Sequence, residues 1–284
     1  MATAIESLQN LRSQVAEKGS IAIFVILALV AIAVLVAFLV IKLAYSQTRG
    51  VLIVDSPLKL YNMSTQTRVD QSIIPPTVNG QEFSSSFWLY LVDYQPTDGP
   101  QLIFMRGSDT TTIGTANPIV ALDGTTNKLY VSARTSRSTT TNPATFMTQA
   151  TSGYLTAIID YFPLQRWVNV VMVVKDDAMS LYLNSSLYTV VNVSDLVDTT
   201  GLVTNVRARP VFTACTGSLT VGAAGVSGVR DPRGYIAQFR FFNYALTQKD
   251  IMTIYTSGPS ATSILARLGL AGYGLRTPIY RVDA

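Results

Sequence analysis

An uncharged apolar stretch over residues 21–41 constrains this chain more than any other feature, because it contains no Asp, Glu, Lys or Arg. As a helix that rises about 1.5 Å per residue it would be about 32 Å long, compared with about 30 Å for the hydrocarbon core of a bilayer. No small-residue cleavage site follows it, so we expect an uncleaved single-pass anchor, a transmembrane helix over 20–45. The residues expected to contact the lipid bilayer are Ile21, Phe24, Leu27, Val30, Val34, Phe38 and Ile41.

The segment before this stretch has the pattern of a short amphipathic helix over residues 1–19. A Thr-x-x-Glu capping box precedes apolar residues that recur at spacings of three, three and four. The basic residues flanking the apolar stretch favour a cytoplasmic C-terminal domain by a margin of one, which the free amino terminus cancels. Three Asn-x-Ser sequons, at Asn62, Asn184 and Asn192, favour an external domain, so the orientation stays open.

The composition excludes several chemistries. Histidine is absent, which rules out Ser-His-Asp and Cys-His nucleophiles, His-ligated zinc or haem and histidine pH switches built from this chain alone. The single cysteine, Cys215, cannot form an intrachain disulfide, and this favours reducing surroundings. The net charge is +4, but the basic residues are scattered singly, so we expect no nucleic-acid partner.

Residues 46–257 have the pattern of an all-β domain. Short runs of Val, Ile, Tyr, Phe and Thr alternate with turn signals such as Asn-Gly, Asp-Gly and Asp-Pro-Arg-Gly. Numerous strands of this kind bury their apolar faces best as a two-sheet antiparallel jelly-roll sandwich. The clearest strands are expected over 83–92, 101–106, 118–121, 128–133, 167–175, 179–183 and 235–242.

Two local patterns refine this expectation. Residues 167–174 are apolar at nearly every position, which predicts a central strand covered by the other sheet on one face and by loops on the other. The Asp176-Asp177 pair that follows is typical of a hairpin turn. The sequence Thr247-Gln248-Lys249-Asp250 is a capping box, and it predicts a short helix through Tyr255.

Three of these blocks carry a family resemblance. They are an early strand at 83–91 (FSSSFWLYL), a hairpin at 165–171 (QRWVNVV) with 181–184 (LYLN), and a strand with a following helix start at 234–247 (GYIAQFRFFNYALT). Their order along the chain and their residue sequences resemble the laminin-G-like branch of the concanavalin A-like lectin/glucanase fold, over about residues 51–255. The resemblance implies a jelly roll; the family includes sugar binders, protein binders and, in distant branches, glycan hydrolases.

The resemblance does not bring catalytic residues with it. The hydrolase branch has a Glu-x-Asp-x-x-Glu strand, whereas Glu82 is the only glutamate after Glu17 in this chain. We therefore expect no enzyme activity, no catalytic residue and no cofactor. Some relatives bind calcium, but the loop aspartates here lack ligand spacing, so we expect turn formation and no metal site. These aspartates are Asp93, Asp98, Asp109 and Asp123.

The tail over residues 258–284 differs from the rest, because it combines Gly, Ala and Ser with large apolar and basic residues. A free tail of this composition would expose much apolar surface to water. Two interpretations stay open: the tail packs back on the sandwich, or it docks on a neighbouring protein. The candidate partner-binding residues are Leu265, Arg267, Leu268, Tyr273, Arg276, Tyr280 and Arg281.

Two functions from different classes fit these patterns. The layout is similar to membrane-anchored, laminin-G-like minor capsid proteins of large icosahedral DNA viruses. This similarity implies a structural protein at an internal virion membrane, with its β domain facing the capsid shell or the cytoplasmic side and contacting other proteins of the assembly. The alternative is a membrane-bound lectin that binds glycans at a cell surface, for which Asp93-Tyr94 is the candidate sugar-binding pair.

Overall fold

The computed structural model describes residues 27–40, 50–62, 67–76, 81–107, 116–138, 147, 153–196, 210–223 and 225–259 of the 284-residue chain. The chain divides into two compact units, Met1–Thr48 and Arg49–Ala284. In the described ranges the first unit contributes a helix, and the second contains all of the strands.

The helix of the first unit covers residues 27–40. At about 1.5 Å per residue this described part is about 21 Å long, compared with roughly 30 Å for the hydrocarbon core of a bilayer. Within the described ranges, no helix has both the length and the apolar character that a membrane crossing requires.

This finding overturns the predicted localisation as a single-pass protein of an internal virion membrane. The prediction assumed that one helix extends over all of residues 21–41, whereas the described helix is shorter. The predicted amphipathic segment over 1–19 lies outside the described residues. Of the expected anchor residues, the helix contains Leu27, Val30, Val34 and Phe38, and those outside the described residues are Ile21, Phe24 and Ile41.

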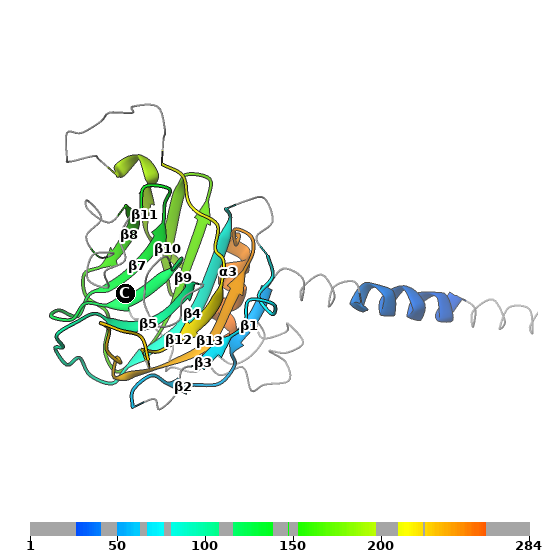
Figure 1. The fold of residues 1–284 in the computed structure, drawn as a ribbon. Coiled ribbons are helices and arrows are strands. Elements are labelled where there is room, and N and C mark those ends of the chain that lie inside the picture. The colour runs from blue at the N-terminus through cyan, green and yellow to red at the C-terminus, as the bar shows by residue number, and fades with distance from the viewer. Residues whose placement is uncertain are drawn as a thin grey trace, which may run out of the picture. The chain divides into compact units, whose positions relative to one another are not determined.

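Two antiparallel sheets form the second unit (Figure 1). Sheet A contains β1 (Gly50–Val54), β2 (Leu58–Lys59), β4 (Phe83–Leu91), β9 (Trp167–Lys175), β10 (Ala178–Leu183), β11 (Ser186–Asn192) and β13 (Gly234–Phe242). Sheet B contains β3 (Thr67–Val69), β5 (Gln101–Gly107), β6 (Ile119–Leu122), β7 (Leu129–Arg134), β8 (Tyr154–Ile159) and β12 (Ser218–Val221). A short 3-10 helix, η1 (Val193–Asp195), follows β11.

The strand order brings distant parts of the sequence together. Sheet A runs β1-β13-β4-β9-β10-β11, with β2 also paired to β13, and sheet B runs β3-β12-β5-β6-β7-β8. All strand pairs between these elements are antiparallel. The expectation of an all-β, two-sheet antiparallel sandwich is therefore confirmed.

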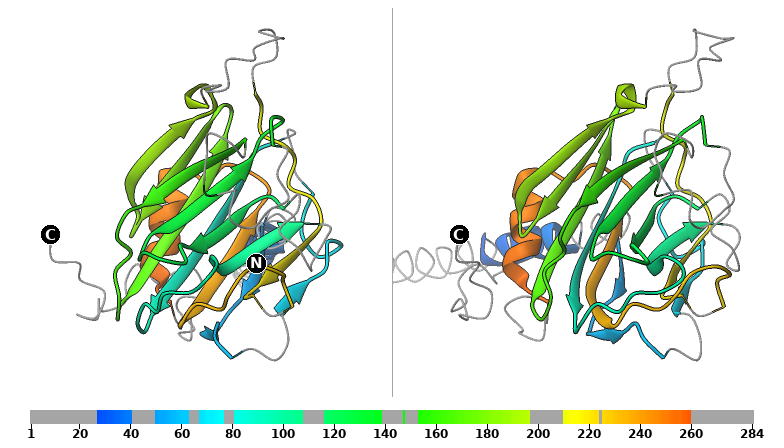
Figure 2. Two further views of the ribbon diagram at one scale, coloured as in Figure 1. Left: turned by 60° about the vertical axis from the view of Figure 1, so that its left-hand side comes forward. Right: turned by 90° about the vertical axis from the view of Figure 1, so that its left-hand side faces the viewer.

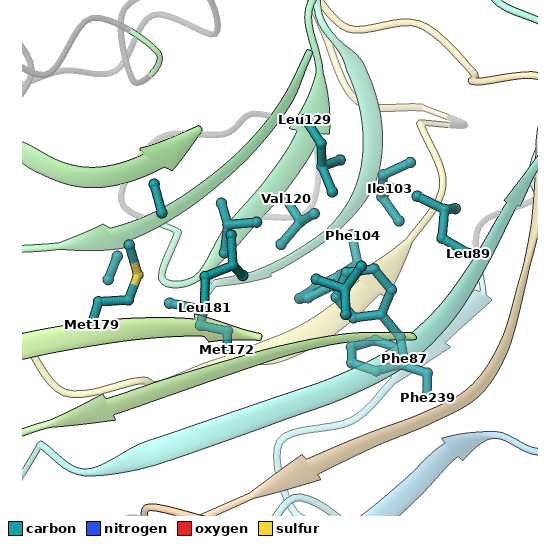
Figure 3. Packing of buried hydrophobic residues seen from close by; sticks show 14 of the residues in the cluster. Phe87, Leu89, Ile103, Phe104, Val120, Leu129, Met172, Met179, Leu181 and Phe239 are labelled. Atoms are coloured by element: carbon teal, nitrogen blue, oxygen red, sulfur yellow. The ribbon is translucent and has the colours of Figure 1, made fainter. Parts of the chain in front are cut away.

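The hydrophobic core lies between the two sheets (Figure 3). On β4, Phe87 and Leu89 face this core while Trp88 between them faces outward, as the two-residue period of a strand requires. The ring centroid of Phe104 lies 5.2 Å from that of Phe87 and 4.3 Å from that of Phe239. Burial of each of these rings contributes about 1.5–3 kcal/mol, so the cluster joins β4 and β13 of sheet A to β5 of sheet B.

Helix α3 (Gln248–Ser257) covers part of the outer face of sheet A (Figure 2). It begins with the predicted capping box, in which Thr247 Oγ1 accepts a hydrogen bond from the Asp250 backbone N–H at 3.3 Å and Asp250 Oδ2 accepts one from the Thr247 N–H at 3.0 Å. Ile251 packs with outward residues of β9, and the ring of Trp88 stacks on that of Tyr255 at 5.7 Å. The outer face of β9 is therefore apolar because a helix, rather than the expected loops, covers it.

Candidate functional site

A row of aromatic side chains crosses the outer face of sheet A. Tyr235 of β13 lies directly opposite Lys59 of β2 on one side and Tyr90 of β4 on the other. Tyr90 in turn lies opposite Trp167 of β9. The residues next to these in sequence face the core or pack against it, which places the row on the outer face: Leu58, Leu89, Val168 and Ile236.

Tyr61 extends this line beyond β2, and we call Tyr61, Tyr235, Tyr90 and Trp167 the aromatic row. Successive ring centroids lie 6.0 Å apart from Tyr61 to Tyr235, 6.3 Å from Tyr235 to Tyr90 and 5.5 Å from Tyr90 to Trp167. All four side chains are half-buried, so each is held by the sheet and still reaches solvent. Tyr235, Tyr90 and Trp167 lie on three strands about 4.8 Å apart, which makes two spacings, and Tyr61 adds about one more, so the row is about 14 Å long.

Polar groups accompany the rings at the Tyr61 end. The Lys59 ammonium lies 4.1 Å from the centroid of the Tyr61 ring, which is within cation–π distance. The hydroxyl oxygens of Tyr61 and Tyr235 lie 3.2 Å apart and share a hydrogen bond. This bond is the main cause that raises the pKa of Tyr235 above its ordinary value. At neutral pH the Tyr235 phenol is therefore uncharged and can donate or accept a hydrogen bond.

The backbone beside the row is fixed by a glycine and an ion pair. A Cβ atom at Gly234 would meet the carbonyl oxygen of Tyr90, so only glycine lets β13 lie this close to β4. Next to it, Arg233 donates from Nη1 to Asp93 Oδ2 at 2.9 Å, and its guanidinium lies 5.9 Å from the Tyr61 ring centroid. These contacts lie where β4 ends and β13 begins, which is also where the aromatic row is located.

The candidate sugar-binding pair Asp93-Tyr94 has partners within the fold. Asp93 forms the ion pair with Arg233, and the Tyr94 hydroxyl donates to the Asp123 carbonyl oxygen at 3.3 Å. Burial raises the pKa of Tyr94, with a smaller contribution from the negative charge of Asp123. The pair therefore holds the loop after β4 in place beside the aromatic row.

The other loop aspartates that were weighed as calcium ligands also have local partners. Asp98 pairs with Arg230 at 2.7 Å, and the Asp123 carboxylate accepts hydrogen bonds from the hydroxyls of Thr125 and Thr126. Asp109 lies outside the described residues. In the described part of the chain, no three Asp, Glu or Cys side chains come together in a way that could hold a metal ion.

A sequence comparison identifies the family. The sequence profile of one family, described as the concanavalin A-like lectin/glucanases superfamily, matches residues 65–252. This range is more than half of the chain. The chain belongs to the concanavalin A-like lectin/glucanases superfamily. The family resemblance inferred from the strand motifs is confirmed at this level, and the narrower similarity to capsid proteins stays a prediction.

Solved structures of botulinum neurotoxin binding domains show a likeness to this member of the superfamily. The serotype D binding domain has a TM-score of 0.48 and 14% identity, over 74% of this chain and 46% of that chain. The serotype D ligand binding domain in complex with N-acetylneuraminic acid has a TM-score of 0.44 and 14% identity, over 72% and 45%. The serotype DC binding domain in complex with rat synaptotagmin II has a TM-score of 0.39 and 15% identity, over 62% and 36%.

In each of these comparisons the chain spans less than half the length of the toxin structure. No curated protein sequence matches the chain.

The sequence motifs did not reveal the aromatic row. Tyr90, Trp167 and Tyr235 lie in the predicted strands or begin them, where they were interpreted as sheet residues. Tyr90 lies near the end of its predicted strand, whereas Trp167 and Tyr235 begin theirs, so only the antiparallel strand order brings the three residues together. The predicted partner-binding residues of the tail lie outside the described residues: Leu265, Arg267, Leu268, Tyr273, Arg276, Tyr280 and Arg281.

Proposed function

We propose that this protein is a carbohydrate-binding member of the superfamily and that a glycan lies along the aromatic row. The single observation that carries the proposal is the register that places Tyr235, Tyr90 and Trp167 opposite one another on the outer face of sheet A. Partly exposed Tyr and Trp side chains offer an apolar face and a polar tip at the same place. A sugar ring has the matching surface, with C–H groups on its faces and hydroxyls around its edge.

The dimensions of the row favour an oligosaccharide over a single sugar. A surface about 14 Å long accommodates several linked rings, since each aromatic ring occupies one strand spacing of about 4.8 Å. The hydrogen-bonded hydroxyls of Tyr61 and Tyr235 and the exposed Lys59 supply polar groups at one end. A few fixed polar groups beside an apolar surface are what sets the orientation of a bound ligand.

We propose that the protein binds the glycan and does not cleave it. Retaining and inverting glycosidases position two carboxyl groups on either side of the scissile bond. Asp93 is connected to the row through Arg233, with which it forms an ion pair and whose guanidinium lies near the Tyr61 ring. Its role beside the row is therefore that of an ion-pair partner that fixes the loop.

The same rings also stabilise the sheet, because cross-strand aromatic pairs contribute roughly 0.2–1 kcal/mol each. A useful experiment must separate glycan binding from folding. We propose to screen the full-length chain on a glycan array and then measure affinity for the best oligosaccharide by calorimetry. Trp167→Ala and Tyr235→Ala should each weaken binding by about tenfold or more, since about 1.4 kcal/mol corresponds to tenfold.

Tyr188→Ala is the matched control, because Tyr188 is an exposed tyrosine of sheet A that lies on β11, away from the row. This variant should bind like the parent chain, and melting curves should show that all the variants are folded. Equal affinity of the parent and both row variants, or no glycan bound by the parent chain, contradicts the proposal.

The first function expected from the sequence, a minor capsid protein at an internal membrane, depended on the localisation that the helix over 27–40 corrects. The part of that expectation that stays a proposal is docking of the 258–284 tail on a partner protein. It is supported by the apolar and basic composition of the tail.

A further inference from the structure

A second candidate site lies at one edge of the sandwich, where the segment after β3 meets the segment before β12. A cavity of about 550 Å³ opens there, and the residues that line it include Asp70, Ile74, Arg106, Cys215 and Thr216. This volume is within the range of about 300–1,000 Å³ that is typical of small-molecule sites. None of the residues of the aromatic row lines the cavity, so the two sites are separate.

Arg106 is the unusual member of this lining, because it is a charged residue with only 2% of its surface exposed. It lies near the end of β5, and its guanidinium stacks on the core residue Phe241, with 4.7 Å from Cζ to the ring centroid. Its Nε donates a hydrogen bond to the Gly217 carbonyl oxygen at 3.1 Å. Its Nη1 is buried and has no hydrogen-bond partner among the described residues.

A buried guanidinium normally has an anionic partner, since an unpaired buried charge is costly. Among the described residues, no carboxylate lies within 4.0 Å of the Arg106 guanidinium. Burial lowers the pKa of Arg106, although arginine stays protonated in proteins. The side chain is therefore a cation that lines a cavity and lacks a counterion from the described part of the fold.

Cys215 lines the same cavity and would carry a negative charge as a thiolate, but its environment prevents this. Burial raises the pKa of Cys215 to about 12, although the charge of Arg106 opposes the effect. The thiol also donates a hydrogen bond from Sγ to the Asn117 carbonyl oxygen at 2.6 Å, which requires the protonated form. Cys215 is accordingly a neutral thiol at physiological pH and leaves the charge of Arg106 uncompensated.

We propose that this cavity binds a small monocarboxylate, with the carboxylate group on the guanidinium of Arg106. One guanidinium matches one negative charge, and a carboxylate fits its planar donor geometry. A phosphate dianion suits the cavity less well, because the carboxylate of Asp70 lines the same space. The bond from the Ser72 backbone N–H, at 2.9 Å, is the main cause that lowers the pKa of Asp70, so this carboxylate is ionised at neutral pH.

Asp70 and the exposed Thr216 also indicate what the rest of the ligand carries. An ionised carboxylate accepts hydrogen bonds, and a threonine hydroxyl both donates and accepts them. A ligand with hydroxyl groups opposite its carboxylate satisfies both residues, whereas a purely aliphatic acid leaves Asp70 facing an apolar group. The ligand class is therefore a small hydroxylated monocarboxylate, such as a sugar acid.

The test is a calorimetric titration of the full-length chain with D-glucuronate, with D-glucose as the neutral match and inorganic phosphate as a second anion. We expect glucuronate to bind at least tenfold more tightly than either. Arg106→Gln should weaken glucuronate binding at least tenfold, and Arg106→Lys should restore part of the loss because it keeps the charge. Asp70→Asn should tighten binding a few-fold, since it removes a repelling charge and keeps a side-chain acceptor for the Ser72 N–H.

Two controls make every outcome informative. Arg166→Gln removes a charge from an exposed arginine that precedes β9 and does not line the cavity, so glucuronate affinity should stay unchanged. Trp167→Ala should also leave it unchanged, which separates this site from the aromatic row. If Arg106→Gln fails to fold, the glucuronate affinity of Asp70→Asn tests the proposal instead. Unchanged affinity in Asp70→Asn, equal binding of glucose and glucuronate, or tighter binding of phosphate overturns the proposal.

Discussion

Tyr90 and Trp167 lie directly opposite each other on β4 and β9, with ring centroids 5.5 Å apart and ring planes inclined by 52°. This pair joins the two middle strands of sheet A at one end, where strands far apart in sequence share an outer face. Each ring packs against one side of the other, and both side chains stay half-buried. The pair therefore connects the stability of sheet A to the surface on which we propose that a glycan binds.

The coupling between these two rings is measurable. In a double-mutant cycle of Tyr90→Ala and Trp167→Ala, the two losses of unfolding free energy should be non-additive by about 0.5–1.5 kcal/mol, the usual value for an aromatic pair. Urea unfolding of the parent, the two single variants and the double variant measures this coupling. Additive losses would show that the rings do not contact each other in solution.

Gly234 should be intolerant of any side chain. A Cβ at this position meets the backbone of Tyr90 and, at 2.9 Å, the side chain of Leu91, and a backbone atom cannot move aside as a flexible side chain can. Gly234→Ala should therefore lower the free energy of unfolding by about 1–3 kcal/mol, the usual cost of overpacking. Denaturant unfolding tests this expectation, and a variant as stable as the parent would contradict the close approach of β13 to β4.

The thiol of Cys215 should make stability fall at alkaline pH. Its folded pKa of about 12 lies above the value of about 8.5 expected in the unfolded chain. Below about pH 8.5 the thiol is protonated in both states and its contribution to stability is complete. As the pH rises further, the unfolded chain releases this proton while the folded chain keeps it, so the free energy of unfolding falls by up to about 1.4 kcal/mol per pH unit.

Cys215→Ser is the variant that isolates this effect, because a serine hydroxyl can still donate to the Asn117 carbonyl but does not titrate in this range. Between about pH 8.5 and 10, its unfolding free energy should depend less on pH than that of the parent. The restriction to this window matters because burial also raises the pKa of Tyr154 to about 12, which adds a second alkaline contribution above about pH 10. Parallel pH profiles would show that Cys215 is not the titrating group.

The two interpretations of the tail are separable by truncation. Helix α3 ends at Ser257 with the Gly258 backbone N–H bonded to the Tyr255 carbonyl, and Pro259 is buried. A chain that ends at Pro259 therefore keeps every described contact of the sandwich, and we expect its melting temperature to stay within about 2 °C of the full-length value. A much lower melting temperature would mean that the tail packs on the sandwich, as the first interpretation holds.

The sequence was most informative for the long central strands of sheet A. The predicted strands at 83–92, 167–175 and 235–242 agree closely with β4, β9 and β13, and the capping box located α3. The hairpin turn at Asp176-Asp177 also joins β9 to β10 as expected. These elements have long apolar runs or explicit start signals, which are local properties of the chain.

The strands that were missed are short or lie at the edge of a sheet. Strand β11 is an edge strand that exposes Leu187 and Val190, so its apolar residues do not mark a buried face.

Neither candidate site follows from sequence pattern. The aromatic row requires β13 to pair with β4 and β2, and this order is set by packing of the whole sandwich. Arg106 ends an apolar strand run, a position where arginine usually reaches solvent. Its burial depends on Phe241, which arrives from the other sheet, so no local motif distinguishes it.

Tryptophan fluorescence during a glycan titration tests the central claim most directly. The chain contains two tryptophans, of which Trp88 is 1% exposed beneath Tyr255 and Trp167 is half-buried in the aromatic row. A bound oligosaccharide should therefore shift the emission of Trp167 and shield it from acrylamide, and Trp167→Phe should abolish both changes. Saturable glycan binding that leaves Trp167 emission and quenching unchanged, or that produces the same changes in Trp167→Phe, would contradict binding along the row.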